Sequence, residues 1–167
     1  MQQGYNKYAF SLRENVALSQ INDIQKSWKI VDALKESSAI NVLKKVGDID
    51  TFLTKIYSEE GVELSGGEWQ KVALARCFFK DSGMMILDEP SASIDAKSEQ
   101  EIFDTISLNE SRRGVILISH RLSNVKSCDK IFVLCMSAIE EFGTHDELID
   151  KQGMYYELYN LQLSKYL

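Results

Sequence analysis

The sequence has few of the features that mark a membrane-spanning, secreted or nucleic-acid-binding protein. Its longest apolar runs, such as Ile131–Met136, have the length of a strand and are far too short to cross a bilayer. The first residues contain neither a basic region nor an apolar core, so we expect no signal peptide. The formal net charge of −6 gives the molecule no electrostatic reason to bind nucleic acid. These absences predict a cytosolic protein.

Cysteine and proline are also scarce, with three cysteines and one proline in 167 residues. Cys77, Cys128 and Cys135 are odd in number and lack the spacing of metal ligands, which indicates buried, reduced thiols. No low-complexity linker or internal repeat separates parts of the chain. A composition of 44% hydrophobic and 26% charged residues is that of one folded domain of ordinary size.

The apolar pattern changes near residue 64. Between about residues 11 and 45, apolar residues recur three or four apart, which predicts helices with one buried face. This face would contain Ile21, Ile24, Trp28, Val31 and Leu34. After residue 64, continuous apolar runs alternate with helical segments, which predicts a parallel sheet covered on both faces. The predicted strands are 83–87, 114–119 and 130–136, and the predicted helices are 72–79, 96–107, a short one after 120, and two within 143–162.

The stretch LSGGEWQ, residues 64–70, places two glycines where a buried helix begins. Ser65 and Glu68 have the spacing of a capping box, in which each side chain bonds the other residue's amide. A capping box does not explain Gly66 and Gly67, since a glycine inside a helix costs about 1 kcal/mol relative to alanine. A phosphate explains them, because a helix N-terminus attracts anions and glycine lets the anion come close.

Two acidic residues end the predicted strand before the single proline. Asp88 and Glu89 would lie at the C-terminal edge of a parallel strand, where open α/β sheets bind ligands. There Asp88 would hold Mg²⁺ through water, and Glu89 would orient or deprotonate an attacking water. The alternative is a strand end with two solvated carboxylates. His120 follows the next strand at the same edge or is a surface histidine, and Asp95 is an acceptable N-cap for the next helix.

In this order the motifs resemble those of the nucleotide-binding domain of ABC transporters, in particular the exporter branch and its peptide or bacteriocin exporters. LSGGEWQ resembles the signature motif, MMILDEP (84–90) the Walker B segment, SASID (91–95) the D-loop, and the SH pair at 119–120 the switch histidine. QGYNKYAFSLREN (3–15) is similar to the Q-loop and the helix that follows it, with Gln3 as the Q-loop glutamine.

The resemblance implies an α/β fold with a P-loop NTPase core of the RecA-like ABC ATPase type, a parallel sheet and an inserted all-helical subdomain. It assigns residues 1–10 to the Q-loop segment, 11–64 to the helical subdomain and 65–167 to the C-terminal part of the ATPase core. It also implies ATP and Mg²⁺ as cofactors. The implied partners are a second ABC nucleotide-binding domain, in a head-to-tail dimer, and the transmembrane domain of an exporter, which would hold the protein at the cytoplasmic face of the membrane.

The same resemblance implies a role for each motif residue. The residues implied to bind nucleotide are Gln3, Leu64, Ser65, Gly66, Gly67, Glu68, Gln70 and Asp95. The signature residues would contact the γ-phosphate held by the partner subunit, and Asp95 would support the dimer interface. Asp88 and, through water, Gln3 would hold Mg²⁺. Glu89 and His120 would act as catalytic residues on the nucleotide bound by their own subunit.

No G-x-x-x-x-G-K-[ST] loop occurs in the sequence, so we expect the N-terminal part of the fold to be absent and autonomous catalysis to fail. Three functions stay open. The chain is the C-terminal part of an exporter ATPase, or a non-catalytic cassette that donates its signature motif to a complete partner, or a nonfunctional remnant. A phosphate loop encoded upstream of Met1 would favour the first, and ATPase activity restored on mixing with a complete cassette would favour the second.

Overall fold

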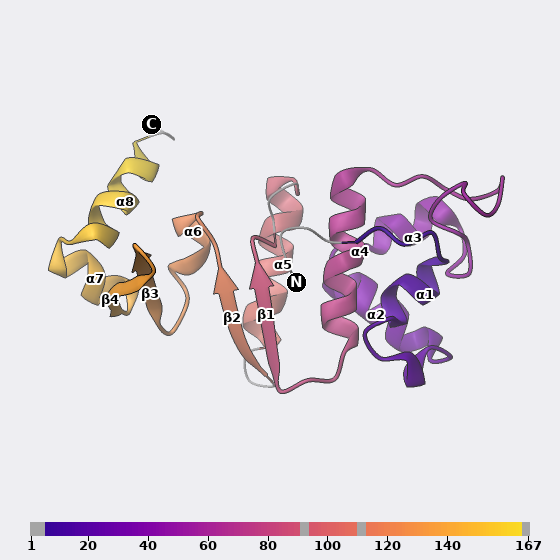
Figure 1. Ribbon diagram of the computed structural model, residues 1–167, viewed down its shortest axis with the longest axis horizontal. Helices are drawn as coiled ribbons and strands as arrows, with labels where there is room; N and C mark the ends of the chain where they lie inside the picture. Colours follow the sequence, from indigo (N-terminus) through magenta and orange to yellow (C-terminus); the bar gives the residue numbers. More distant parts are fainter. Residues whose placement is uncertain (1–5, 91–93, 110–112, 165–167) are drawn as a thin grey trace. The chain divides into compact units, whose positions relative to one another are not determined.

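The computed structural model describes residues 6–90, 94–109 and 113–164, and the chain divides into two compact units, residues 1–118 and 119–167 (Figure 1). The elements of the first unit are α1 (Leu12–Ala17), the 3₁₀ helix η1 (Ile21–Asp23), α2 (Ser27–Glu36), α3 (Ile40–Val46), α4 (Gly66–Phe79), β1 (Met84–Asp88), α5 (Ala96–Asn109) and β2 (Gly114–Ile118). The second unit contains α6 (Leu122–Val125), β3 (Ile131–Cys135), β4 (Ala138–Gly143), α7 (His145–Lys151) and α8 (Met154–Leu163). Within the described ranges, no helix is both long and apolar enough to span a membrane.

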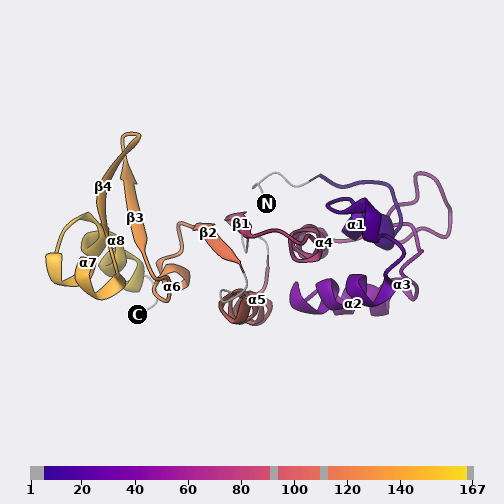
Figure 2. The same cartoon turned by 90° about the horizontal axis from the view of Figure 1, so that it is seen from below.

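Helix α4 lies at the centre of the helical part of the first unit. Its part within the predicted helix 72–79 is apolar except for Arg76, and Trp69, Leu74 and Phe79 are each at most 2% exposed. Helices α1 and α2 pack against it (Figures 1 and 2). Because α4 contributes to one continuous core with both of these helices and with β1, its position links the helical segment to the strands.

The predicted buried face of the segment before α3 is wrong in two of its members. Ile21 is 58% exposed and Trp28 is 65% exposed. Ile21 lies in η1, before the chain starts a new helix, so a period counted across this break does not follow one helical face. Trp28 lies in α2, but on a side of that helix away from its buried residues. Within α2 the buried side is formed by Ile30, Ala33 and Leu34, of which only Leu34 was predicted.

Strands β1 and β2 pair in parallel, as predicted, with Asp88 opposite Ile118. One face of this pair packs on α5, where Met85 and Leu87 join Ile102 in the core (Figure 2). The prediction that both faces are covered is wrong for the part of the chain that the structure describes. The other face has the side chains that are 47% to 56% exposed, namely Met84, Ile86, Ile116 and Ile118.

The second unit contains an antiparallel hairpin where the sequence predicted one strand of a parallel sheet. Strand β4 was missed, because two glutamates interrupt its apolar pattern. Met136 and Ser137 form the two-residue turn with φ of 46° and 67°, and positive φ at both positions is typical of tight hairpins. Helices α7 and α8 were predicted, and they bury Leu148 and Tyr155 in this unit.

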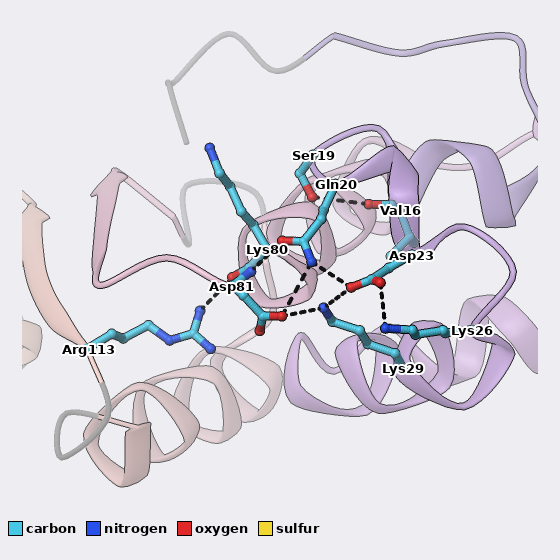
Figure 3. Close-up of polar contacts among 9 residues, drawn as sticks. All are labelled: Val16, Ser19, Gln20, Asp23, Lys26, Lys29, Lys80, Asp81 and Arg113. Atoms are coloured by element: carbon cyan, nitrogen blue, oxygen red, sulfur yellow. Dashed lines mark hydrogen bonds and ion pairs between the residues drawn. The ribbon is translucent and has the colours of Figure 1, made fainter.

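A polar cluster in the first unit joins the η1–α2 region to the loop between α4 and β1 (Figure 3). Lys29 Nζ lies 2.6 Å from Asp23 Oδ2 and 2.8 Å from Asp81 Oδ2. Lys26 binds the other oxygen of Asp23, and Gln20 donates hydrogen bonds to both carboxylates. Hydrogen bonds from Lys26 and Lys29 lower the pKa of Asp23, and those from Lys29 and Gln20 lower the pKa of Asp81.

We expect this cluster to make the first unit less stable in acid. Since the pKa of Asp23 is lower in the folded chain than its unfolded value of about 3.9, the stabilisation is complete above that value and is lost as the pH falls through the folded pKa. Urea unfolding followed from about pH 6 to about pH 2 measures this decline. Lys29→Met should lower stability at the upper pH and make the decline shallower. Lys35→Met removes an exposed pair with Asp32 and is the control. An equally steep decline in Lys29→Met and wild type would contradict the expectation.

Candidate functional site

The LSGGEWQ stretch forms the N-terminal end of α4. Ser65 is the N-cap: its Oγ accepts a hydrogen bond from Glu68 N at 3.3 Å, and Glu68 Oε2 accepts one from Ser65 N at 2.7 Å. The predicted capping box is therefore confirmed. Leu64 is buried, Ser65 and Gly66 are exposed, and Gly67 is half-buried. The first turn of a 14-residue helix thus reaches solvent at this point.

Lys45 on α3 balances the acidic residue in this turn. Its Nζ lies 2.8 Å and 3.1 Å from the two carboxylate oxygens of Glu68 and 3.0 Å from Glu63 O. Partial burial by itself would raise the pKa of Glu68, but hydrogen bonds from Lys45 and Ser65 lower it, so the carboxylate is ionised and paired. The charge of Glu68 is thereby offset, and the positive end of the helix dipole can act on an anion. Sequence reasoning missed Lys45, because no local pattern connects α3 to α4.

The two carboxylates predicted at the edge of the sheet lie where β1 ends. Asp88 is the last residue of β1, and both it and Glu89 are half-buried. Glu89 has a φ of 45°, in the left-handed region, and its N–H donates to Ile118 O at 2.9 Å. A left-handed residue other than glycine costs about 1–3 kcal/mol and persists where its surroundings hold it.

Gln70 connects α4 to this edge. It is 2% exposed, and its Nε2 donates to Pro90 O at 2.9 Å and more weakly to Glu89 O at 3.4 Å. The sequence-based interpretation assigned Gln70 to the nucleotide, whereas its amide nitrogen bonds the backbone that follows β1. Contact between Gln70 and a nucleotide stays a prediction.

Asp95 caps helix α5, as predicted. Its Oδ1 accepts a hydrogen bond from Ser98 N at 3.0 Å, and the backbone and side chain of Ser98 lower the pKa of Asp95 to about 2. Lys71 reaches the same cap from α4, with its Nζ 2.6 Å from Ser98 Oγ and 3.4 Å from Asp95 Oδ2. Consecutive residues of α4, Gln70 and Lys71, therefore contact the segments on either side of residues 91–93.

Other predicted site residues lie elsewhere. Gln3 and residues 91–93 of the expected D-loop fall outside the described residues. His120 belongs to the second unit, where its carbonyl accepts a hydrogen bond from Gln162 Nε2 and Ser119 Oγ accepts one from Arg121 N. The predicted catalytic role of His120 stays a prediction.

The residues present fit part of a Mg²⁺–phosphate site. No group of three or more His, Cys, Asp or Glu residues that could hold a metal occurs within the described ranges. Mg²⁺ does not need such a cage, since it usually keeps several waters and is held by one or two carboxylates together with phosphates. Asp88 supplies one such carboxylate. At the helix end, a Cβ added to Gly66 would meet no atom within 4 Å, so the described chain gives no packing reason for glycine there.

Known proteins match the chain along most of its length. Residues 2–92 match the family model described as ABC transporter. The nisin transport ATP-binding protein NisT of Lactococcus lactis subsp. lactis is 40% identical over 160 residues, which are 94% of this chain and 26% of NisT. The subtilin transport ATP-binding protein SpaT of Bacillus subtilis is 37% identical over 162 residues, which are 92% of this chain and 25% of SpaT. The chain thus spans about a quarter of the length of these relatives.

A solved structure has the same fold. A bacterial Atm1-family ABC exporter with ATP bound superimposes with a TM-score of 0.84 and 29% sequence identity, over 96% of this chain and 27% of that chain. The predicted fold class, the P-loop NTPase fold of an ABC ATPase, is therefore confirmed. With a family model that matches more than half of its residues, the chain belongs to the ABC transporter family.

Proposed function

We propose that the chain is part of the ATP-binding component of an ABC exporter and takes part in ATP hydrolysis coupled to export across the membrane. The observation that carries the proposal is the solvent-exposed N-terminal turn of α4, where Ser65 is the N-cap and two glycines follow. A turn of this kind suits the phosphate of a nucleotide. The carboxylates at the end of β1, and relatives named as transport ATP-binding proteins, support the same function.

Within this proposal, the motif residues act on two different nucleotides. Residues 64–68 would bind the γ-phosphate of ATP held by a second ABC nucleotide-binding domain, arranged head to tail, and Asp95 would support the interface. Asp88 and Gln3 would hold Mg²⁺ through water on the nucleotide of their own subunit. Bound Mg²⁺ would offset charge on the β- and γ-phosphates. Glu89 would orient or deprotonate the attacking water, and His120 would contact the γ-phosphate.

The proposed partner in the membrane is the transmembrane domain of an exporter, so the chain would lie at the cytoplasmic face. Two of the relatives are named for the transport of nisin and subtilin. We propose a bacteriocin-like peptide as the class of cargo. Since the 167 residues contain no phosphate loop of the G-x-x-x-x-G-K-[ST] type, that loop would have to come from residues outside this sequence.

The test is Ser65→Arg in the native polypeptide that contains this sequence, purified from its source cells. An arginine at this exposed N-cap removes the hydroxyl and fills the space that a phosphate needs. We expect ATP turnover to fall at least ~100-fold, the size typical of losing a group that stabilises charge in the transition state. Turnover is measured by phosphate release at saturating Mg-ATP.

Thr144→Arg is the matched control, because Thr144 and Glu147 form the same capping box at α7, a helix with no proposed ligand. Both substitutions remove an N-cap, which costs about 1 kcal/mol of stability. Equal loss of turnover in the two variants would attribute the effect to the cap and contradict the proposal. If turnover appears only on mixing with a complete cassette, the proposal is contradicted. The chain would then be a non-catalytic cassette that donates its signature motif to that partner.

A further inference from the structure

We infer that Gln70 is a positioning residue for Glu89: its buried amide holds the backbone that carries the catalytic carboxylate. The inference rests on the proposed function, because it concerns the activation of water by Glu89. In this inference Gln70 does not contact the nucleotide directly; it acts on Glu89 through the protein backbone.

The backbone conformation at Glu89 is unfavourable for two reasons and therefore needs stabilising contacts from other elements. Its φ of 45° lies in the left-handed region, which residues other than glycine and asparagine rarely adopt. In addition, Pro90 follows it, and the residue before a proline is driven toward an extended conformation by contact with the proline ring. Both effects act against the observed conformation, so the carboxylate would move if the surroundings were loosened.

Hydrogen bonds hold this backbone from both sides. On the amide side, Glu89 N–H donates to Ile118 O in β2 at 2.9 Å. On the carbonyl side, Gln70 Nε2 donates to Pro90 O at 2.9 Å, with a longer contact of 3.4 Å to Glu89 O. These hydrogen bonds involve two different elements, the strand β2 and the helix α4. Together they hold the peptide unit before Glu89 and the carbonyls of Glu89 and Pro90 that follow it, with the shorter bond at Pro90.

Gln70 is suited to this role by its own burial. It is 2% exposed, and its neighbours on α4, Trp69 and Val72, are at most 2% exposed. A side chain packed in this way has little freedom to release the carbonyls. The side-chain amide also has the hydrogen-bond donor that this place needs, because a backbone carbonyl oxygen only accepts hydrogen bonds. An ionised carboxylate at the same place would repel the carbonyl oxygen.

The consequence is a link between two functional segments. The first turn of α4 carries the signature residues, and one turn later Gln70 of the same helix donates to the carbonyls of Glu89 and Pro90. Since a small displacement of a catalytic group can lower a rate by about 100-fold, loss of this hold should appear in the chemical step and not in nucleotide affinity.

The experiment compares Gln70→Met with wild type in the native polypeptide. Methionine keeps the length and removes the donor. We expect kcat for ATP hydrolysis to fall at least ~10-fold with KM for Mg-ATP within about twofold, the pattern of an interaction that acts in the transition state. In the nucleotide-free protein, we expect amide hydrogen exchange at Glu89 to become at least ~10-fold faster.

Ser37→Ala is the control, since the buried Ser37 Oγ donates to Leu34 O and contacts neither Glu89 nor Pro90. It should leave kcat and the exchange rate at Glu89 near the wild-type values. If Gln70→Met does not fold, Gln70→Glu keeps the shape and removes the N–H donor when ionised, with the same expected results.

A raised KM with unchanged kcat would show Gln70 to be a nucleotide ligand and overturn the inference. Unchanged kcat and unchanged exchange at Glu89 would also overturn it. If wild type shows no ATP turnover, the proposed function fails, and the exchange rate at Glu89 alone decides whether Gln70 holds this backbone.

Discussion

Glu89→Gln is expected to lower ATP turnover by the native polypeptide at least ~100-fold while leaving its affinity for Mg-ATP nearly unchanged. The substitution keeps the size of the side chain and its capacity to accept one hydrogen bond, but removes the carboxylate that would take a proton from water. Asp88, which precedes it at the end of β1, is unchanged in this variant and keeps its proposed role in holding Mg²⁺. The variant should therefore bind Mg-ATP as wild type does but hydrolyse ATP much more slowly.

Two measurements check this expectation: phosphate release at saturating Mg-ATP, and equilibrium binding of a fluorescent ATP analogue. Glu140→Gln makes the same chemical change at an exposed position of β4 and should leave turnover at the wild-type level. Turnover within a factor of about three of wild type in Glu89→Gln would contradict a role for Glu89 in proton transfer, since general-base catalysis contributes about 10²–10⁴-fold.

Asn15→Leu is expected to destabilise the first unit by about 3 kcal/mol. Asn15 is 0% exposed, and its Nδ2 donates to the carbonyls of Tyr8, Phe10 and Ser11 at 3.0–3.1 Å. Its Oδ1 accepts a hydrogen bond from Arg76 Nη2 at 2.7 Å. Leucine satisfies none of these groups. Burial already lowers the pKa of Arg76, and the substitution removes one acceptor from its guanidinium.

Urea unfolding of the 167-residue chain, followed by tryptophan fluorescence, measures the loss. Asn22→Leu is the matched control, because Asn22 is exposed in η1, and its substitution should change stability by less than about 0.5 kcal/mol. The expectation fails if Asn15→Leu costs less than about 1 kcal/mol, since an unsatisfied buried polar group alone costs about 1–3 kcal/mol. Arg76 also donates to Asn6 O, so the same variant should loosen residues 6–10 of the predicted Q-loop segment.

The features that local sequence patterns predicted correctly are those whose cause is itself local. The capping box of Ser65 and Glu68 involves two residues of one helical turn, and its hydrogen bonds depend little on the rest of the molecule. The same holds for Asp95 as the cap of α5. The apolar runs that became β1 and β2 were recognised because a continuous apolar segment of strand length is typical of a strand in a parallel sheet, although one face of this pair is exposed.

The features that the sequence pattern missed depend on contacts between distant parts of the chain. Strand β4 contains two glutamates, and one of them, Glu141, is buried because it accepts hydrogen bonds from the first amides of α8. A polar residue in that role breaks the apolar pattern of a strand. Trp28 failed in the opposite sense: it is apolar but exposed. The two three-residue steps from Trp28 through Val31 to Leu34 leave Trp28 about 120° around α2 from Leu34, away from the buried side of that helix.

The family resemblance, the capped start of α4 and the two acids at the end of β1 follow from the sequence alone, because each depends on residues that are adjacent or one turn apart. Two other contacts could be seen only in the folded chain: Lys45 offsets the charge of Glu68, and Gln70 donates to the backbone carbonyls of Glu89 and Pro90. These pairs come from separate elements, and whether two such side chains meet is set by how the helices and strands pack, which no local period or motif encodes.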